Sequence, residues 1–114
     1  MLPTLLFGHQ QERLAARFLK RQGLRILGRN VRVGRDELDL VARDGGVAVV
    51  VEVRYRKRDR VAADLSIDHR KIACLRRAWY RLARDLHLPP RTPVRFDLVL
   101  TSADGSLSWH RGVV

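Results

Sequence analysis

The sequence has little cysteine and no long hydrophobic run, and each shortage removes a class of protein. The one cysteine, Cys74, lies in a segment with helical periodicity, which argues against disulfide bonds and cysteine-ligated zinc. The longest apolar run, residues 47–51, is far too short to cross a bilayer. The first residues lack the charged region and the small-residue cleavage site of a secretion signal. We therefore expect a cytoplasmic protein that makes no membrane contact.

Several catalytic motifs are missing as well. The four histidines lack the spacing of metal ligands, and the serines stand in no known nucleophile motif. No glycine-rich loop of the kind that cradles phosphate is present. Any chemistry of this chain must therefore depend on its acidic and basic side chains.

Positive charge is abundant. The 23 Lys and Arg residues against 12 Asp and Glu residues give a net charge of +11, and only three of the basic residues are lysines. The codon usage of a GC-rich genome would explain arginine in place of lysine, but it does not explain the large positive excess. Such a charge makes polyanions the natural partners, above all DNA or RNA.

The 114 residues fit one domain, 1–114. Apolar periodicity predicts a helix at 9–22, strands at 24–33, 37–42 and 47–55, a helix at 67–86, and strands at 94–101 and 107–113. Asp64 or Ser66 is suited to cap the second helix. Alternation in the second strand places Leu38, Leu40 and Ala42 on one face. The valine run of the third strand is apolar on both faces, which predicts a central strand covered on both sides. The helix at 67–86 has an apolar stripe that predicts its buried face: Ile72, Leu75, Trp79, Leu82 and Leu86. This order predicts an α/β fold in which helices flank a mixed β-sheet.

Acidic residues gather on two neighbouring strands around a tight turn at residues 44–46. Asp39 lies on the first strand, while Glu52 and Arg54, two residues apart on the second, share a face. The hairpin brings Asp39 beside them. A carboxylate at the end of a valine run needs a cation or a metal ion, so an ion pair of Glu52 with Arg54 or another arginine is the purely structural alternative. Glu12, in the first helix, is either a solvated acid near the helix start or a third acid that points toward this group.

Two carboxylates in a very basic protein suggest attack on a phosphodiester. A divalent cation shields the phosphate charge and activates water, and Mg²⁺ or Mn²⁺ accepts the oxygen ligands that Asp39 and Glu52 supply, with the Val53 carbonyl as a further ligand. Basic residues that follow the second acid or begin the second helix are predicted to contact nucleic-acid phosphates: Arg56, Lys57, Arg58, Arg60, Arg70 and Lys71.

These residues form an ordered set that resembles a known family. The set comprises Glu12 with residues 14–16, Asn30, residues 37–42 and 51–56, Lys71, and residues 95–99. Across nearly the whole chain it looks like the YraN-type uncharacterised bacterial family, which is similar to archaeal Holliday-junction resolvases of the PD-(D/E)xK nuclease superfamily. The resemblance implies a restriction-endonuclease-like αβββαβ core, metal ligation by Glu12, Asp39 and Glu52, and a Lys71 that lies near the nucleic acid.

Two positions depart from the family pattern. Asp36 takes a glycine position, and Arg54 stands where the motif has lysine. Arginine keeps the charge, but its guanidinium is larger and is not deprotonated in proteins.

Three hypotheses follow from these residues. The first is a metal-dependent endonuclease that acts on structured or branched DNA, with Glu12, Asp39, Glu52 and Arg54 as its catalytic residues. The second is a nucleic-acid-binding module of the same fold that no longer cleaves, and the third is a scaffold whose basic surface is incidental. Resolution of a DNA junction requires two active sites, and therefore a homodimer.

Overall fold

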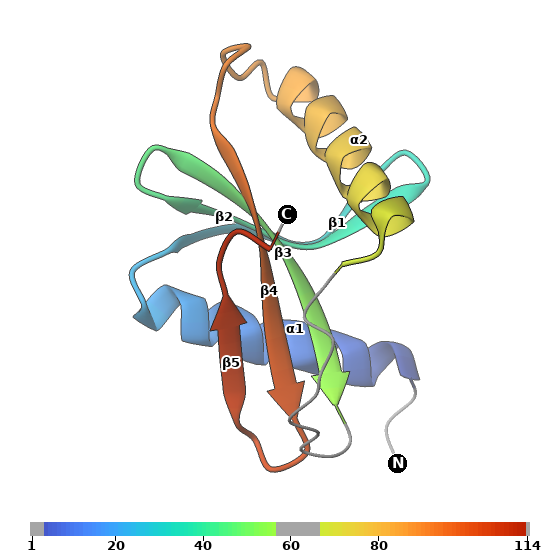
Figure 1. Ribbon diagram of the computed structural model, residues 1–114, viewed down its shortest axis with the longest axis vertical. Coiled ribbons are helices and arrows are strands. Elements are labelled where there is room, and N and C mark those ends of the chain that lie inside the picture. Colours follow the sequence, from blue (N-terminus) through green and yellow to red (C-terminus); the bar gives the residue numbers. More distant parts are fainter. Residues whose placement is uncertain (1–3, 57–66, 114) are drawn as a thin grey trace.

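The computed structural model describes residues 4–56 and 67–113, with side chains from residue 8 onward. Two helices and five strands follow one another in the predicted order (Figure 1): α1 (Thr4–Arg21), β1 (Arg25–Val33), β2 (Asp36–Asp44), β3 (Val47–Arg56), α2 (His69–Asp85), β4 (Val94–Ser102) and β5 (Leu107–His110). The α/β class is confirmed. The helix α1 begins earlier than predicted, and β5 ends earlier than predicted.

The strands form one mixed sheet in the order β1-β2-β3-β4-β5. The β3 and β4 strands are parallel, and the other three neighbouring pairs are antiparallel. A parallel pair needs a crossover connection, and α2 lies within this one. The central strand is therefore β3, as its valine run predicts.

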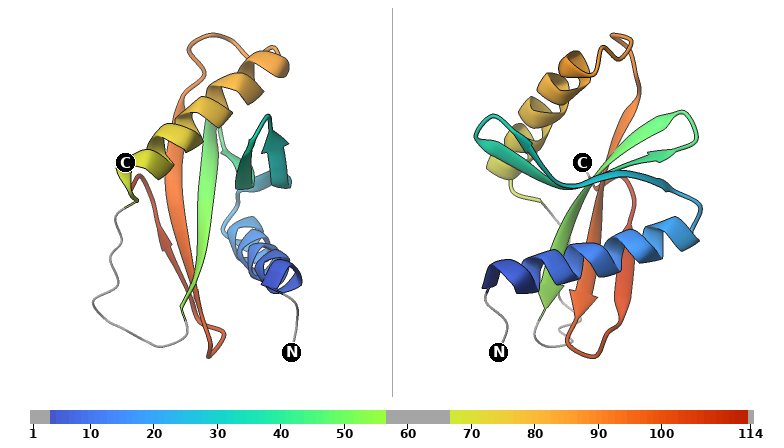
Figure 2. Two further views of the ribbon diagram at one scale, coloured as in Figure 1. Left: turned by 90° about the vertical axis from the view of Figure 1, so that its right-hand side faces the viewer. Right: turned by 180° about the vertical axis from the view of Figure 1, so that it is seen from behind.

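Helices cover both faces of the central strand. Val49 and Val51 belong to a buried cluster with residues of α1, whereas Val50 packs in a second cluster with Leu75 and Trp79 of α2. Figure 2 (left) shows α1 and α2 on opposite sides of the sheet. Trp79 is a core residue, as its place in the apolar stripe predicts.

The helix α2 is capped by Asp68, whose Oδ1 accepts a hydrogen bond from the Arg70 N–H at 2.7 Å. The prediction of Asp64 or Ser66 as the cap is therefore wrong, and both of those residues lie outside the described residues. Leu86 was expected in the buried stripe, but it is 56% exposed because the helix ends at Asp85.

Two hairpins join the first three strands. Gly45, in the turn between β2 and β3, has φ +61°, a conformation that glycine adopts without steric cost. This turn holds Asp44 opposite Val47, so it fixes the register of the hairpin.

The β2 and β3 strands separate before either ends. They pair from Asp44 opposite Val47 to Leu40 opposite Val51. Beyond that point β2 continues beside β1 alone, and β3 continues beside β4 alone. Figure 2 (right) shows the β1–β2 ribbon turning away from β3 and β4. We call this point of separation the fork.

The fork also corrects the predicted faces of β2. Leu38 packs in the α2 cluster together with Val41, whereas Leu40 and Ala42 pack in the α1 cluster. The expected grouping of Leu38 with Leu40 and Ala42 is wrong because β2 leaves the main sheet at Leu40 and changes direction there.

Candidate functional site at the fork

Asp39 lies on β2 next to Leu40, the residue at which the pairing of β2 with β3 ends. Its Oδ2 accepts a hydrogen bond from the Val53 N–H at 2.9 Å. The Asp39 carboxylate thus takes the place of a backbone acceptor where the ladder between the two strands has ended. The prediction that the hairpin brings Asp39 beside the end of the valine run is confirmed.

Glu52 precedes Val53 and is only 9% exposed. Its Oε2 lies 3.4 Å from the Nζ of Lys71, which α2 supplies from its first turn. The pKa of Glu52 is raised to about 7, chiefly by burial and also by the nearby charge of Asp39, while the Lys71 ammonium acts in the opposite direction. The structure therefore assigns Lys71 as a cationic partner of Glu52.

Glu12 reaches the fork from α1 and is also 9% exposed. Its pKa is raised to about 7, chiefly by burial and also by the carboxylates of Asp39 and Glu37, while hydrogen bonding with Asn30 acts in the opposite direction. The Oε2 of Glu12 is buried, and no group of the described residues forms a hydrogen bond with it. The alternative that Glu12 is a solvated acid is therefore wrong, because its side chain is buried between α1 and the sheet.

Asp39 interacts electrostatically with both glutamates, because its negative charge raises the pKa of Glu12 and that of Glu52. The Asp39 carboxylate thus disfavours the charged form of Glu12 from α1 and of Glu52 from β3, and a cation would relieve that repulsion. The unpartnered Glu12 oxygen and this excess of carboxylates are a donor set that suits a hard divalent ion.

The three carboxylates are not close enough together to bind one metal ion as three ligands in the described structure. Among the residues that the structure describes, no three His, Cys, Asp or Glu side chains are grouped closely enough to hold a metal ion. Mg²⁺ commonly binds through one or two carboxylates and keeps several waters, so the Asp39 and Glu52 pair meets its needs without a third side chain. The full set of Glu12, Asp39 and Glu52 stays a prediction.

The remaining predicted residues fall in three places. Arg54 lies on β3 two residues beyond Glu52 and is half-buried, as is Arg56 at the end of the strand. Arg70 is exposed in the first turn of α2. The other predicted phosphate contacts lie outside the described residues: Lys57, Arg58 and Arg60.

Sequence reasoning placed Lys71 near a nucleic acid but missed its contact with Glu52. The two residues are far apart in the chain, and only the crossover of α2 brings them together. One signal was present in the sequence. Lys71 is the single lysine of a helix whose other long basic residues are all arginines.

Two further aspartates are structural. Asp97, fully buried on β4, accepts hydrogen bonds from the Arg95 guanidinium, the Trp109 indole N–H and the Gly112 N–H. These contacts tie β5 and the residues after it to β4. The buried carboxylate is well satisfied, so we assign Asp97 no part in the site at the fork.

Asp36 binds Arg77 of α2 through two parallel hydrogen bonds of 2.9 and 2.8 Å. The Arg77 hydrogen bonds and charge lower the pKa of Asp36. Asp36, which stands where the family pattern has glycine, therefore holds the end of the β1–β2 hairpin against α2.

Neither helix of the described residues is long and apolar enough to span a membrane.

Known proteins resemble this chain over most of its length. The model of the Uncharacterised protein family UPF0102 matches residues 11–101, which include every site residue named above. A UPF0102 protein of Kosmotoga olearia is 36% identical over 96% of this chain and 94% of its own length. One from Pseudomonas fluorescens strain Pf0-1 is 44% identical over 90% of this chain and 87% of its own. One from Bordetella parapertussis is 44% identical over 96% of this chain but only 64% of its own. On these grounds the chain belongs to the protein family UPF0102.

Proposed function

We propose that this protein is a Mg²⁺- or Mn²⁺-dependent endonuclease that acts on structured or branched DNA. The observation that supports it most directly is the pair of Asp39 and Glu52 on neighbouring strands at the fork, with the Lys71 ammonium 3.4 Å from Glu52 and the buried Glu12 carboxyl within reach of the Asp39 charge. Acids that keep raised pKa values in one place are more typical of a functional site than of a structural ion pair.

Asp39 and Glu52 would hold the metal ion, with Glu12 as a third ligand through its unpartnered oxygen. The bound ion would shield the phosphodiester and lower the pKa of a water molecule beside it. Asp39 is held in place by the Val53 N–H, and Glu52 by Lys71. Both carboxylates are therefore oriented before any ligand arrives.

Lys71 supplies the compact ammonium that the family motif places two residues after the second acid. It reaches the site from α2 rather than from β3, and its side chain is 41% exposed. An ammonium at this point can stabilise the negative charge that develops on phosphorus during attack. Arg54, with its planar guanidinium, is suited to hold the phosphate itself.

DNA contact would extend from the fork along neighbouring basic side chains. Arg56 ends β3 and Arg70 begins α2, so both flank the site. Lys57, Arg58 and Arg60, outside the described residues, stay phosphate contacts predicted from the sequence alone. Cleavage of both strands of a junction would need a homodimer. The net charge of +11 favours DNA over neutral or cationic substrates.

One observation favours a second candidate, a nucleic-acid-binding module that does not cleave. Position 54 carries arginine, and if the motif lysine must orient or activate water, a guanidinium there will not replace it. If the Lys71 ammonium replaces the motif lysine that is absent at position 54, the protein cleaves; if it does not, the protein only binds.

A cleavage assay separates them. We expect Mn²⁺-dependent cutting of a four-way junction by the wild type, none by Asp39→Ala, and a rate at least about 100-fold lower for Lys71→Ala. Lys20→Ala removes a lysine from the exposed end of α1 and should cut at the wild-type rate. Duplex and single-stranded DNA complete the substrate series.

Calorimetry with Mn²⁺ gives a second readout. Wild type and Lys71→Ala should bind the ion, and Asp39→Ala should not. No cleavage by either wild type or Arg54→Lys, together with retained DNA binding, would favour the non-cleaving module. Absence of Mn²⁺ affinity in the wild type would defeat the enzyme proposal outright.

A further inference from the structure

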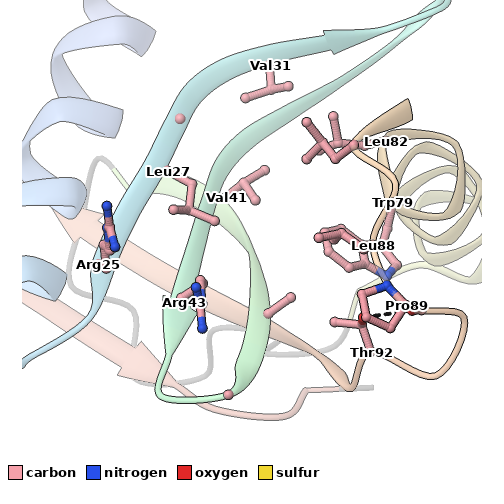
Figure 3. A pocket seen from close by; sticks show the side chains of 14 residues that line it. Arg25, Leu27, Val31, Val41, Arg43, Trp79, Leu82, Leu88, Pro89 and Thr92 are labelled. Atoms are coloured by element: carbon pink, nitrogen blue, oxygen red, sulfur yellow. Dashed lines mark hydrogen bonds between the residues drawn. The ribbon is translucent and has the colours of Figure 1, made fainter. Parts of the chain in front are cut away.

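A pocket of about 600 Å³ lies away from the fork, between the β1–β2 hairpin and the C-terminal half of α2. Its walls are mainly apolar. Figure 3 shows Leu27, Val31 and Val41 on the two strands facing Trp79, Leu82 and Leu88 across it. None of the acids at the fork, nor Lys71, lines this space.

The charged residues of the pocket are both arginines. Arg25 and Arg43 lie directly opposite each other across β1 and β2, and both are exposed. Like charges that face each other across antiparallel strands destabilise the pair. No acid lines the pocket, and within the described ranges neither arginine forms an ion pair with a carboxylate. An anion between the two guanidinium groups would remove this repulsion.

Apolar side chains at the same pocket are left in water. Leu27 is 50% exposed and Leu86 is 56% exposed, and both line the pocket. Covering them would bury apolar surface at roughly 25 cal/mol per Å². A ligand that satisfied the arginines alone, such as inorganic phosphate or a DNA backbone, would leave this surface uncovered.

We propose that this pocket binds a small organic anion whose apolar body lies against the leucines and whose carboxylate or phosphate lies between Arg25 and Arg43. The volume falls within the range of roughly 300 to 1,000 Å³ that small-molecule sites occupy. Two guanidinium groups suit carboxylate and phosphate oxygens because their N–H groups bind such oxygens in pairs. This inference does not depend on the nuclease proposal.

Calorimetry with matched probes tests both halves of the proposal. Decanoate and decyl phosphate carry the apolar chain and the anion, decyltrimethylammonium carries the chain with the opposite charge, and acetate carries the anion alone. We expect the decyl anions to bind at least about tenfold more tightly than either of the other two.

Variants locate the site. Arg25→Ala and Arg43→Ala should each weaken decanoate binding about tenfold or more, and Leu27→Asp should do the same. Arg13→Ala removes the same charge from an exposed position on α1, across the sheet, and should bind as the wild type does. The Arg43→Ala protein should melt no lower than the wild type, because it loses a repulsive pair.

Three results would overturn the proposal. One is equal binding of decanoate and decyltrimethylammonium, which would show an apolar surface without charge recognition. Another is decanoate binding that survives both arginine substitutions. The third is failure of the decyl anions to bind while an acidic amphipathic helical peptide binds, which would assign the pocket to a protein partner.

Discussion

At the residue scale, the site at the fork is a place where the fold tolerates unfavourable charge. Glu12 and Glu52 are both buried near Asp39, and their pKa values are raised to about 7. Glu52 has a cationic partner in Lys71. Residues that destabilise the fold while converging on one point are typical of sites kept for function.

Stability should therefore depend on pH through these acids. The ordinary pKa of a glutamate is 4.5, so between about pH 4.5 and 7 the folded protein keeps protons that the unfolded chain has released. Their contribution to the unfolding free energy is fully present below pH 4.5 and is lost as the pH rises through 7. Glu52→Gln removes one of these two acids, so its unfolding free energy should fall less between about pH 4.5 and 7 than that of the wild type. The expected difference is roughly 2 kcal/mol, from about 1.4 kcal/mol per pKa unit reduced for solvent screening.

Urea unfolding of the wild type and of Glu52→Gln, at pH 5 and at pH 8, measures how the unfolding free energy of each depends on pH. The Glu52→Gln protein should be the more stable of the two at pH 8, because it no longer holds a buried carboxylate beside Asp39. Asp85→Asn, at the exposed end of α2, is the matched control and should follow the wild type. A Glu52→Gln protein with wild-type pH dependence would contradict the proposed electrostatics.

Asp97 illustrates the opposite situation, a buried acid with every oxygen satisfied. Asp97→Ala leaves the Arg95 guanidinium and the Trp109 indole N–H without their acceptor. We expect a loss of about 3 to 5 kcal/mol in the free energy of unfolding. Chemical denaturation checks this, with Asp85→Ala expected to cost little. A loss below about 1 kcal/mol would mean that the network is replaceable by water.

At the element scale, α2 serves two parts of the sheet at once. Its buried face packs in one cluster with residues of β1, β2, β3 and β4, and its Arg77 holds Asp36 at the start of β2. The same helix delivers Lys71 to the fork. The position of α2 therefore sets both the anchoring of the β1–β2 hairpin and the charge at Glu52.

Loss of the Arg77 link should loosen the hairpin without unfolding the protein. In Arg77→Ala we expect faster hydrogen exchange at the amides around Asp36 and unchanged exchange in β4, because the core of the sheet does not use this contact. Exchange followed by NMR measures it residue by residue. Arg84→Ala, exposed at the last turn of α2, should leave the hairpin amides unchanged.

Much of this fold follows from local pattern. The valine run predicts a central strand covered on both faces, and the stripe through Leu75 and Trp79 predicts the buried face of α2. The misses arise where distant segments decide the outcome. Leu38 changes face because β2 leaves the main sheet, and no alternation within β2 reveals that departure.

The candidate site divides in the same way. The hairpin turn fixes Asp39 near Glu52, so local reasoning finds that pair. The Lys71 contact depends on the angle of α2 after a parallel crossover, which periodicity does not encode. Asp68 as the cap was also missed, because three acidic or hydroxyl residues near the helix start all have the chemistry of a cap.

At the scale of the whole molecule, the positive charge is spread over both helices and the strand ends. A net charge of +11 attracts DNA at long range, but each phosphate contact then depends on a particular side chain. Arg70 and Arg84 lie at opposite ends of α2, so they offer a test of where the DNA lies.

Binding to a DNA junction should weaken steeply as salt rises, since each phosphate contact releases counterions. We expect Arg70→Ala to reduce the slope of log K against log salt by about 1, and Arg84→Ala to leave it unchanged. Fluorescence anisotropy in Ca²⁺, at several salt concentrations, provides the measurement. Equal slopes for wild type and Arg70→Ala would place the DNA elsewhere on the surface.

The fork divides the sheet into two arms that share one short ladder. Asp39 stands on the β1–β2 arm and Glu52 on the β3–β4 arm, at the point where the ladder ends. The separation of the two carboxylates is therefore set by the angle between the arms, beyond the last pair of the ladder, Leu40 with Val51. A ligand that both carboxylates held would join the two arms where no strand pairing joins them.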